Sequence, residues 1–220
     1  MKTLFIPCHS KRDPLPVVDK ALEDLRDFKR VGLITTAQHV NQLEKIRDFL
    51  LERNKEVFVG GQILGCELRN ALKIEDDVDV FLYIGSGRFH PLGVSLSTKK
   101  PVVVANPLSD SVDWISDEEK KRWLGRGKGR VARAMDVGVY GILVSTKTGQ
   151  FNLDLALKVR DELVSKGKTV FLFAGDEITP ERVLGFKVDA WVNTACPRII
   201  DDFFEKPVLN PDELEFVPVV

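Results

Sequence analysis

The chain has 220 residues, of which 44% are apolar and 30% charged, so it can bury a sizeable core and is not a disordered segment. Its 32 basic and 33 acidic residues leave a net charge of −1, which argues against a protein whose main task is to neutralise nucleic-acid phosphates. No apolar run is long enough to cross a membrane, and three widely spaced cysteines do not form a disulfide scaffold. We therefore expect a cytoplasmic protein whose thiols stay reduced.

The sequence contains two similar halves. Residues 31–36, Val-Gly-Leu-Ile-Thr-Thr, match residues 140–145, Tyr-Gly-Ile-Leu-Val-Ser, and each has the composition of a buried strand. A segment with apolar residues at helical spacing follows each strand, over residues 40–53 and 153–166. The remaining matched pairs are 54–59 with 167–172, 78–83 with 188–193, and 100–104 with 206–209.

Short apolar strands that alternate with helices are typical of parallel sheets covered on both faces. We predict an α/β protein made of two tandem repeated three-layer units with mainly parallel sheets, over residues 13–112 and 137–220. Residues 113–136 are predicted to be a basic linker, since residues 120–133 hold seven basic side chains and no acidic one. Two interpretations of this segment stay open: a helical linker with a solvated basic face, or a contact for an acidic partner or an anionic ligand.

Residues 1–12 precede the two units. Within them, residues 2–7 resemble the strand that closes a unit, but no opening strands come before them. We expect an N-terminal strand here. It is either the end of a missing first repeat or an edge strand added to the first sheet, and both interpretations stay open.

All three cysteines and all three histidines fall in loops that follow predicted strands. In open parallel sheets, ligands bind beyond the carboxyl ends of the strands. Cys8, Cys66 and Cys196 are either small buried side chains or ligands; they are too far apart for a local zinc motif but could converge on one iron–sulfur cluster. Because Cys66 and Cys196 belong to different predicted units, such a cluster would lie between the two sheets. His39 and His90 are weaker candidates, since a loop histidine more often serves as a hydrogen-bonding group.

Two of these loops are rich in small residues. Gly85, Ser86 and Gly87 form a turn whose backbone N–H groups could hold a carboxylate or a phosphate. The turn lacks the complete dinucleotide-binding pattern, so alone it is a weak signal. The segment Lys-Thr-Gly-Gln at residues 147–150 could act similarly, although it is not a Walker motif.

Four segments, in this order, resemble the diphthamide synthesis family. They are residues 61–66 (Gly-Gln-Ile-Leu-Gly-Cys), 83–93 (Tyr-Ile-Gly-Ser-Gly-Arg-Phe-His-Pro-Leu-Gly), 145–150 (Ser-Thr-Lys-Thr-Gly-Gln) and 193–202 (Asn-Thr-Ala-Cys-Pro-Arg-Ile-Ile-Asp-Asp). The resemblance extends over residues 30–215. It implies a three-repeat α/β protein in which each repeat gives one cysteine to a [4Fe–4S] cluster, and the open iron of the cluster holds S-adenosylmethionine. It further implies that a 3-amino-3-carboxypropyl radical is generated and added to a histidine of elongation factor 2.

Residue by residue, the resemblance implies that Cys66 and Cys196 ligate the cluster. The residues that it places in the wall of the cofactor site are Gly85, Ser86, Gly87, His90 and Gln150. The first repeat and its cysteine are missing, so a third ligand would come from Cys8 or from a neighbouring subunit, or else there is no cluster.

Three function hypotheses follow. The first is a diphthamide-synthase-like enzyme that acts alone or as a homodimer. The second is a non-catalytic truncated paralogue or accessory subunit that partners a full-length synthase or docks elongation factor 2 through residues 120–133. The third is a module that binds a small molecule between its sheets. We expect no membrane association and no direct binding of nucleic acid.

Overall fold

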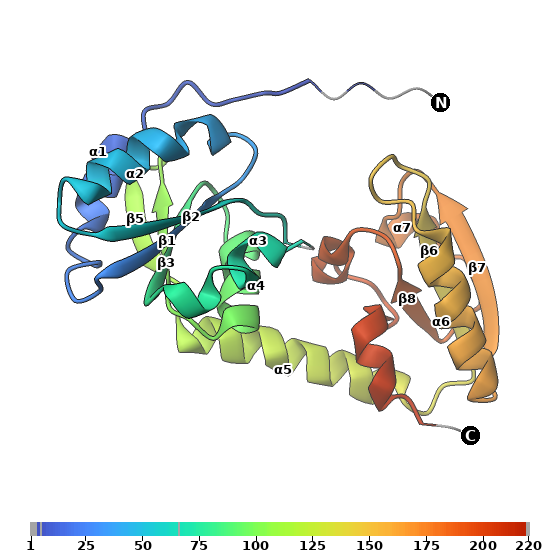
Figure 1. Ribbon diagram of the computed structural model, residues 1–220. Coiled ribbons are helices and arrows are strands. Elements are labelled where there is room, and N and C mark those ends of the chain that lie inside the picture. Colours follow the sequence, from blue (N-terminus) through green and yellow to red (C-terminus); the bar gives the residue numbers. More distant parts are fainter. Residues whose placement is uncertain (1–3, 5, 66, 219–220) are drawn as a thin grey trace. The chain divides into compact units, whose positions relative to one another are not determined.

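The computed structural model describes residues 4, 6–65 and 67–218 (Figure 1). The chain divides into two compact units, Met1–Lys120 and Lys121–Val220. Each unit is built on its own mostly parallel sheet with helices packed against it, so the predicted α/β fold class is confirmed. No helix within the described ranges is both long and apolar enough to span a membrane.

The first unit contains a five-stranded sheet in the order β2-β1-β3-β4-β5, in which β5 is antiparallel to its neighbour and the other strands are parallel. The strands are β1 (Arg30–Thr35), β2 (Glu56–Gln62), β3 (Val80–Ile84), β4 (Val102–Asn106) and β5 (Ser111–Trp114). The helices are α1 (Leu15–Ala21), α2 (Leu43–Leu51), α3 (Arg69–Leu72) and α4 (Phe89–Thr98), with 3₁₀ turns at Val40–Gln42 and Glu75–Asp77.

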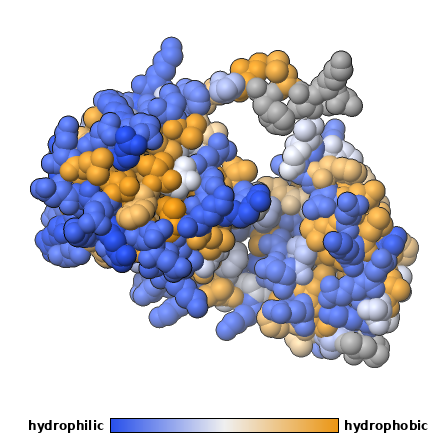
Figure 2. All heavy atoms as spheres, viewed as in Figure 1, coloured by the Kyte–Doolittle hydropathy of each residue, from blue (hydrophilic) through white to orange (hydrophobic). Residues whose placement is uncertain are grey.

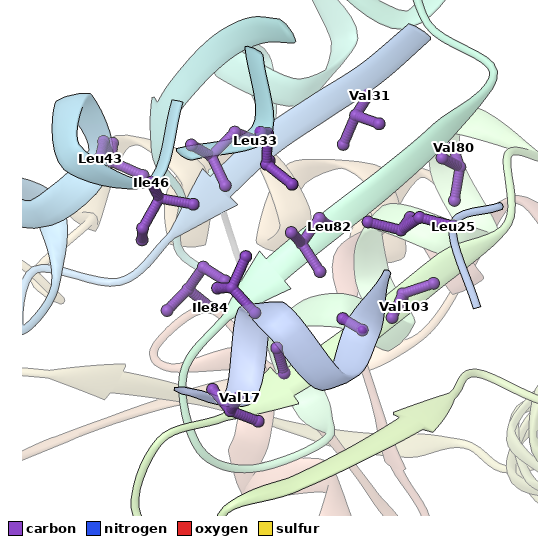
Figure 3. Packing of buried hydrophobic residues seen from close by; sticks show 14 residues of the cluster. Val17, Leu25, Val31, Leu33, Leu43, Ile46, Val80, Leu82, Ile84 and Val103 are labelled. Atoms are coloured by element: carbon purple, nitrogen blue, oxygen red, sulfur yellow. The ribbon is translucent and has the colours of Figure 1, made fainter. Parts of the chain in front are cut away.

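The core of this unit lies between the sheet and the pair α1 and α2 (Figure 3). Alternate residues of a strand point to the same face, and Val31 and Leu33 of β1 therefore enter this core together. From α2, Leu43 and Ile46 face the same core because residues three or four apart share one side of a helix. Full burial of one such side chain stabilises the fold by about 1.5–3 kcal/mol.

The second unit contains a four-stranded sheet in the order β7-β6-β8-β9, and all its pairings are parallel among the described residues. Its strands are β6 (Val139–Ser145), β7 (Thr169–Gly175), β8 (Ala190–Asn193) and β9 (Val208–Leu209). Its helices are α5 (Asp117–Ala134), which begins in the first unit, α6 (Leu153–Ser165) and α7 (Pro180–Val183), with 3₁₀ turns at Pro197–Asp201 and Pro211–Phe216. Figure 2 shows apolar side chains at the surface over α6 and β7, where Val164, Phe171 and Leu172 are exposed.

The two units repeat one packing detail in their central strands. Gly32 of β1 lies opposite Phe81 of β3, and a Cβ atom on Gly32 would lie 2.7 Å from the Phe81 ring. Gly141 of β6 lies opposite Trp191 of β8, and a Cβ atom there would overlap the indole. In both units the aromatic ring therefore fills the space that a glycine leaves in the neighbouring strand.

The structure differs from the sequence prediction at the N-terminus. Residue 4 and residues 6–12 are in no strand, and the side chains of Leu4 and Ile6 are exposed. A strand is stable when its backbone N–H and C=O groups pair with those of a neighbour, and these residues pair with no strand of either sheet. Residues 1–3 and 5 lie outside the described part of the chain.

The segment between the predicted units is ordered secondary structure. It holds the end of β5 and all of α5. Strand β5 was not predicted: the chain turns back after β4 through a short connection, which permits an antiparallel pairing of Val103 with Trp114. Trp114 then covers the core beside Phe28, with ring centroids 6.0 Å apart.

Because the space next to each central glycine is filled, Gly32→Ala and Gly141→Ala should each lower the free energy of unfolding by about 1–3 kcal/mol. Denaturant titration of the full chain measures the free energy of unfolding of each variant. Gly138→Ala is the matched control, since nothing lies within 4 Å of its added Cβ, and it should change stability by less than about 0.5 kcal/mol. Equal stability of all three variants would contradict the packing explanation.

Candidate functional site

The turn of Gly85, Ser86 and Gly87 connects β3 directly to α4. Strands β2 and β3 lie on opposite sides of β1, so the turn stands where the order of strands reverses, which is the usual ligand position in an open parallel sheet. Gly85 and Gly87 have φ angles of 153° and 78°, which glycine adopts without steric cost. Gly85 is buried, whereas Ser86 and Gly87 are exposed, so the backbone of the turn is accessible.

Tyr83 holds this turn in place. Its buried hydroxyl donates to the carbonyl oxygen of Ser86 at 3.2 Å, and a Cβ atom on Gly85 would lie 2.8 Å from the Tyr83 Oη. Burial raises the pKa of Tyr83 to about 12, so the phenol stays protonated and remains a donor at neutral pH. The turn therefore depends on a residue that is not itself exposed to a ligand.

His90 lies in the first turn of α4, with its ring 5.7 Å from that of Phe89 in an edge arrangement. A Cβ atom on Gly65 would overlap the Phe89 ring, so the loop before residue 66 packs directly against α4. Backbone hydrogen bonds of 3.1 Å join Leu64 and Glu67 in both directions. Cys66 lies outside the described residues; Gly65 and Leu68, which flank it, lie against α4, the helix that follows the 85–87 turn.

Arg88 follows the turn but is engaged elsewhere. Its guanidinium donates to Glu119 at 2.6 Å, to Asp113 at 2.8 Å and to the carbonyl oxygen of Trp114 at 2.6 Å. Both carboxylates raise the pKa of Arg88. This network joins the turn to β5 and to the start of α5, so Arg88 supports the turn instead of offering a free cation to a ligand.

In the second unit, Asn193 at the end of β8 shapes the loop that carries Cys196. The Asn193 amide nitrogen donates to the Cys196 carbonyl oxygen at 2.9 Å, and its amide oxygen accepts from the Ala195 N–H at 3.0 Å. Thr194 donates its hydroxyl to the Leu143 carbonyl oxygen at 2.9 Å. Cys196 is a free, half-buried cysteine, and the bond from Asn193 fixes its backbone carbonyl.

Residues 145–150 follow β6, the strand next to β8, so they lie at the same edge of the sheet as Cys196. The Thr146 hydroxyl donates to Asp176, and the Gln150 N–H donates to the Lys147 carbonyl oxygen at 3.0 Å. Gly149 has a φ of 84°, which permits the tight turn. Gln150 is exposed at the end of this turn.

A cavity of about 820 Å³ opens beside Lys147 in the second unit. Its lining includes Phe173 and Phe186, whose ring centroids are 4.5 Å apart. It also includes Lys147, Asp176 and an ion pair in which Arg182 contacts Glu177 at 2.6 Å. A lining with both apolar and charged side chains suits a small ligand that has an apolar and a charged part. Of these residues, the sequence prediction gave only Lys147 a possible binding role, as part of the 147–150 segment.

Cys8 lies in exposed coil, not after a strand as predicted. The neighbouring residues attach to the loop after β1: His9 Nδ1 lies 3.2 Å from the Ala37 carbonyl oxygen, and the Ser10 N–H donates to the Gln38 carbonyl oxygen at 2.7 Å. The segment around Cys8 is thereby held at the carboxyl edge of the first sheet, the edge from which the 85–87 turn emerges.

The predicted site residues thus divide between the units. Gly85, Ser86, Gly87 and His90 lie together in the first unit, and Gln150 and Cys196 lie at one sheet edge in the second. His39 is buried and lies 3.0 Å from the Gln42 side chain, so it has a hydrogen-bonding role in its loop.

A cysteine-ligated cluster would need thiols that are not otherwise engaged. Cys8 and Cys196 are both free cysteines, and cysteine thiolates are the ligands that hold iron–sulfur clusters. The residues that the structure describes include no group of three His, Cys, Asp or Glu side chains placed to hold a metal; Cys66 is not among those residues.

The fold and these loops define a repeated α/β protein whose candidate binding groups lie at the carboxyl ends of parallel strands. The model of the diphthamide synthesis protein family matches residues 1–218. A 2-(3-amino-3-carboxypropyl)histidine synthase of Pyrococcus horikoshii is 34% identical over 98% of this chain and 65% of its own length. A relative in Schizosaccharomyces pombe, subunit 1 of the synthase of the same name, is 28% identical over 97% of this chain and 52% of its own length.

A solved structure is also similar. The crystal structure of Dph2 from Pyrococcus horikoshii with a 4Fe-4S cluster matches with a TM-score of 0.86 and 29% identity, over 96% of this chain and 67% of that one. The chain belongs to the diphthamide synthesis protein family. It spans about two thirds or less of the length of these relatives.

If Asn193 fixes the 193–196 loop, Asn193→Ala should lower the free energy of unfolding by about 1–3 kcal/mol and expose the Ala195 amide to hydrogen exchange. Asn193→Asp is the matched variant, because it keeps the acceptor for Ala195 and loses the donor to Cys196. Protection of the Ala195 amide should persist in Asn193→Asp; equal exchange in both variants would contradict this role.

The pair formed by Glu67 and Arg69, in the loop that flanks residue 66, also predicts an effect of pH on stability. Hydrogen bonds from the Arg69 side chain, then from its backbone N–H, lower the pKa of Glu67 from 4.5 to about 2. The stabilisation by this pair is therefore present above pH 4.5 and is lost as the pH falls through about 2. An NMR titration should place the Glu67 pKa near 2 and nearer its ordinary value in Arg69→Gln; an unchanged pKa in that variant would refute the assignment.

Proposed function

We propose that this chain acts in the first step of diphthamide synthesis. In this proposal it binds a [4Fe–4S] cluster and S-adenosylmethionine, and transfers the 3-amino-3-carboxypropyl group to a histidine of elongation factor 2. Family membership and the name of the Pyrococcus relative support this activity. The 4Fe-4S cluster in the similar Dph2 structure supports the cofactor.

We assign Cys66, Cys196 and Cys8 as the thiolate ligands. The observation that carries this assignment is the attachment of His9 and Ser10 to the loop after β1. The attachment keeps the free cysteine Cys8 at the carboxyl edge of the first sheet, although the segment around it forms no strand. Cys196 is supported by its free, half-buried sulfur on a loop that Asn193 fixes.

Other residues would bind and orient the second cofactor. When bound, a reduced cluster supplies the electron that cleaves a carbon–sulfur bond of S-adenosylmethionine. The N–H of Gly85 already donates to the Ala105 carbonyl oxygen at 3.0 Å, so the exposed Ser86 and Gly87 are the part of the turn that suits the carboxylate of that molecule, and Tyr83 holds this part in place. The Gln150 side chain and His90 supply further polar contacts in this proposal.

A second function is favoured by one observation, the name of the relative in Schizosaccharomyces pombe, which is subunit 1 of a synthase. This chain would then be an accessory subunit that partners a full-length synthase. In that case the partner, and not Cys8, would complete the ligand set.

Anaerobic reconstitution with iron and sulfide separates the two functions. The enzyme proposal predicts about four irons per chain or per dimer, with an absorbance spectrum that S-adenosylmethionine alters. Cys66→Ala and Cys196→Ala should each abolish iron binding, and Cys8→Ala should reduce its occupancy, while Ser10→Ala in the same segment should leave it unchanged.

Two results would contradict the enzyme proposal. Unchanged iron in Cys66→Ala or Cys196→Ala would exclude a shared cluster. If the chain is folded and binds no iron by itself, but raises the activity of an added full-length synthase, the accessory function is established. Full iron occupancy in Cys8→Ala would show only that Cys8 is not the third ligand.

A further inference from the structure

Strand β7 lies at one edge of the second sheet, with β6 as its neighbour (Figure 1). Its seven residues, Thr-Val-Phe-Leu-Phe-Ala-Gly, include no charged side chain and no proline. The side chains of Phe171 and Leu172 are 52% and 38% exposed. Natural proteins seldom leave an apolar edge of this length open, because its unpaired backbone groups readily accept another strand.

The other edge strands that the structure describes each have a feature that discourages such pairing. Strand β2 begins with the exposed Glu56 and has a register shift in its pairing with β1. Strand β5 is four residues long and contains Asp113, and β9 has two residues, both buried. Charge, irregularity and short length all protect an edge. Strand β7 has none of these features, since its register with β6 is continuous over all seven residues.

The backbone of β7 offers a symmetric set of hydrogen-bonding groups. Successive residues of a strand direct their backbone N–H and C=O groups to opposite sides in the plane of the sheet. The Thr169 N–H donates to the Gly138 carbonyl oxygen at 2.9 Å, so the odd-numbered residues of β7 face β6. The backbone groups of Val170, Leu172 and Ala174 therefore point outward, and Leu172 is the centre of this set.

This set is complementary to a second copy of itself. If two β7 strands run antiparallel with Leu172 opposite its own copy, Val170 comes opposite Ala174 on both sides of the centre. These are hydrogen-bonded pairs, which together supply about six backbone hydrogen bonds. On the other face of the sheet Phe171 comes opposite Phe173, and aromatic cross-strand pairs are favourable.

The charges that follow the strand favour the antiparallel direction. Asp176 and Glu177 come directly after β7, and both are exposed. Antiparallel pairing about Leu172 separates the two copies of Asp176 by roughly 25 Å, at about 3.3 Å per residue. Parallel pairing in register would place these carboxylates side by side, where they would repel each other.

The exposed apolar surface indicates how stable such a contact is. Phe171, Leu172 and Phe186 are 52%, 38% and 45% exposed, and Phe186 packs against Phe173 with ring centroids 4.5 Å apart. Together these three side chains offer roughly 250 Å² of apolar surface per copy. With the outer backbone of the strand, the contact falls at the low end of specific protein interfaces, so it is reversible and depends on concentration.

We propose that two copies of this chain associate by antiparallel pairing of β7 with β7, which joins their four-stranded sheets into one. A two-fold contact of this kind is closed and stops at two copies. The inference goes beyond the proposed function, since no residue of β7 belongs to the proposed cluster or cofactor site and the contact needs no iron.

Sedimentation velocity of the full chain, from about 1 to 300 µM with a reductant present, tests the association. The mass should rise from that of one chain to that of two. Leu172→Lys places two like charges opposite each other at the centre of the contact and should raise the dissociation constant at least tenfold. Phe203→Lys adds the same charge at a side chain that is 92% exposed, between β8 and β9, and should change it by less than about twofold. Circular dichroism checks that both variants are folded.

Hydrogen exchange followed by NMR tests the contact itself. At high concentration the N–H groups of Val170, Leu172 and Ala174 should exchange at least about tenfold more slowly than at low concentration, because they are then bonded to the second copy. Those of Phe171 and Phe173 face β6 and should change little.

Four results would overturn the proposal. The first is a single chain at every concentration, and the second is a dimer that persists in Leu172→Lys or is lost equally in Phe203→Lys. The third is growth beyond two copies, which would indicate open aggregation. The fourth is protection of the outward-facing amides that does not depend on concentration, which would show that the edge is covered within one chain.

Discussion

The arrangement of both units depends on a glycine in the central strand that faces an aromatic ring in the next strand. Gly32 with Phe81, and Gly141 with Trp191, join β1 to β3 and β6 to β8. These are the strand pairs at which the order of each sheet reverses. Since ligands bind at such reversals, the same packing contact that builds the core also sets the positions of the 85–87 turn and of the 193–196 loop.

Buried polar groups fix the conformation of these loops, and other residues of the same loops remain exposed to solvent. The Tyr83 hydroxyl, the Thr194 hydroxyl and the Asn193 amide each bond to backbone atoms of the loop or strand beside them. Ser86 is exposed and Cys196 is half-buried at the ends of the same strands. This division is what a binding site requires, because a ligand is recognised precisely only when the groups that contact it are held by others that do not.

The chain belongs to the diphthamide synthesis protein family, and the similar Dph2 structure, 67% of which it matches, holds a 4Fe-4S cluster. In the cluster assignment proposed above the N-terminal segment matters, because its attachment through His9 and Ser10 holds the segment around Cys8 at the carboxyl edge of the first sheet. Helix α5 adds a different property, since Gly127, Val131 and Ala134 on one of its faces are buried and Arg130 pairs with Glu213.

Periodicity and repetition in the sequence determined the α/β class, the two units, most strands and the helices at residues 43–51 and 153–165. The reason is that burial of one face makes apolar residues recur about every 2 residues in a strand and about every 3.6 residues in a helix. The motifs likewise determined the family and the candidate cysteines. Tertiary structure alone decided that residues 6–12 form no strand, that β5 pairs antiparallel, and that Asn193 and Tyr83 hold the loops. The first two depend on whether a backbone segment finds a neighbouring strand. The last two depend on side chains that turn toward loop backbone atoms two or three residues away, and a hydrophobic pattern carries no information about either.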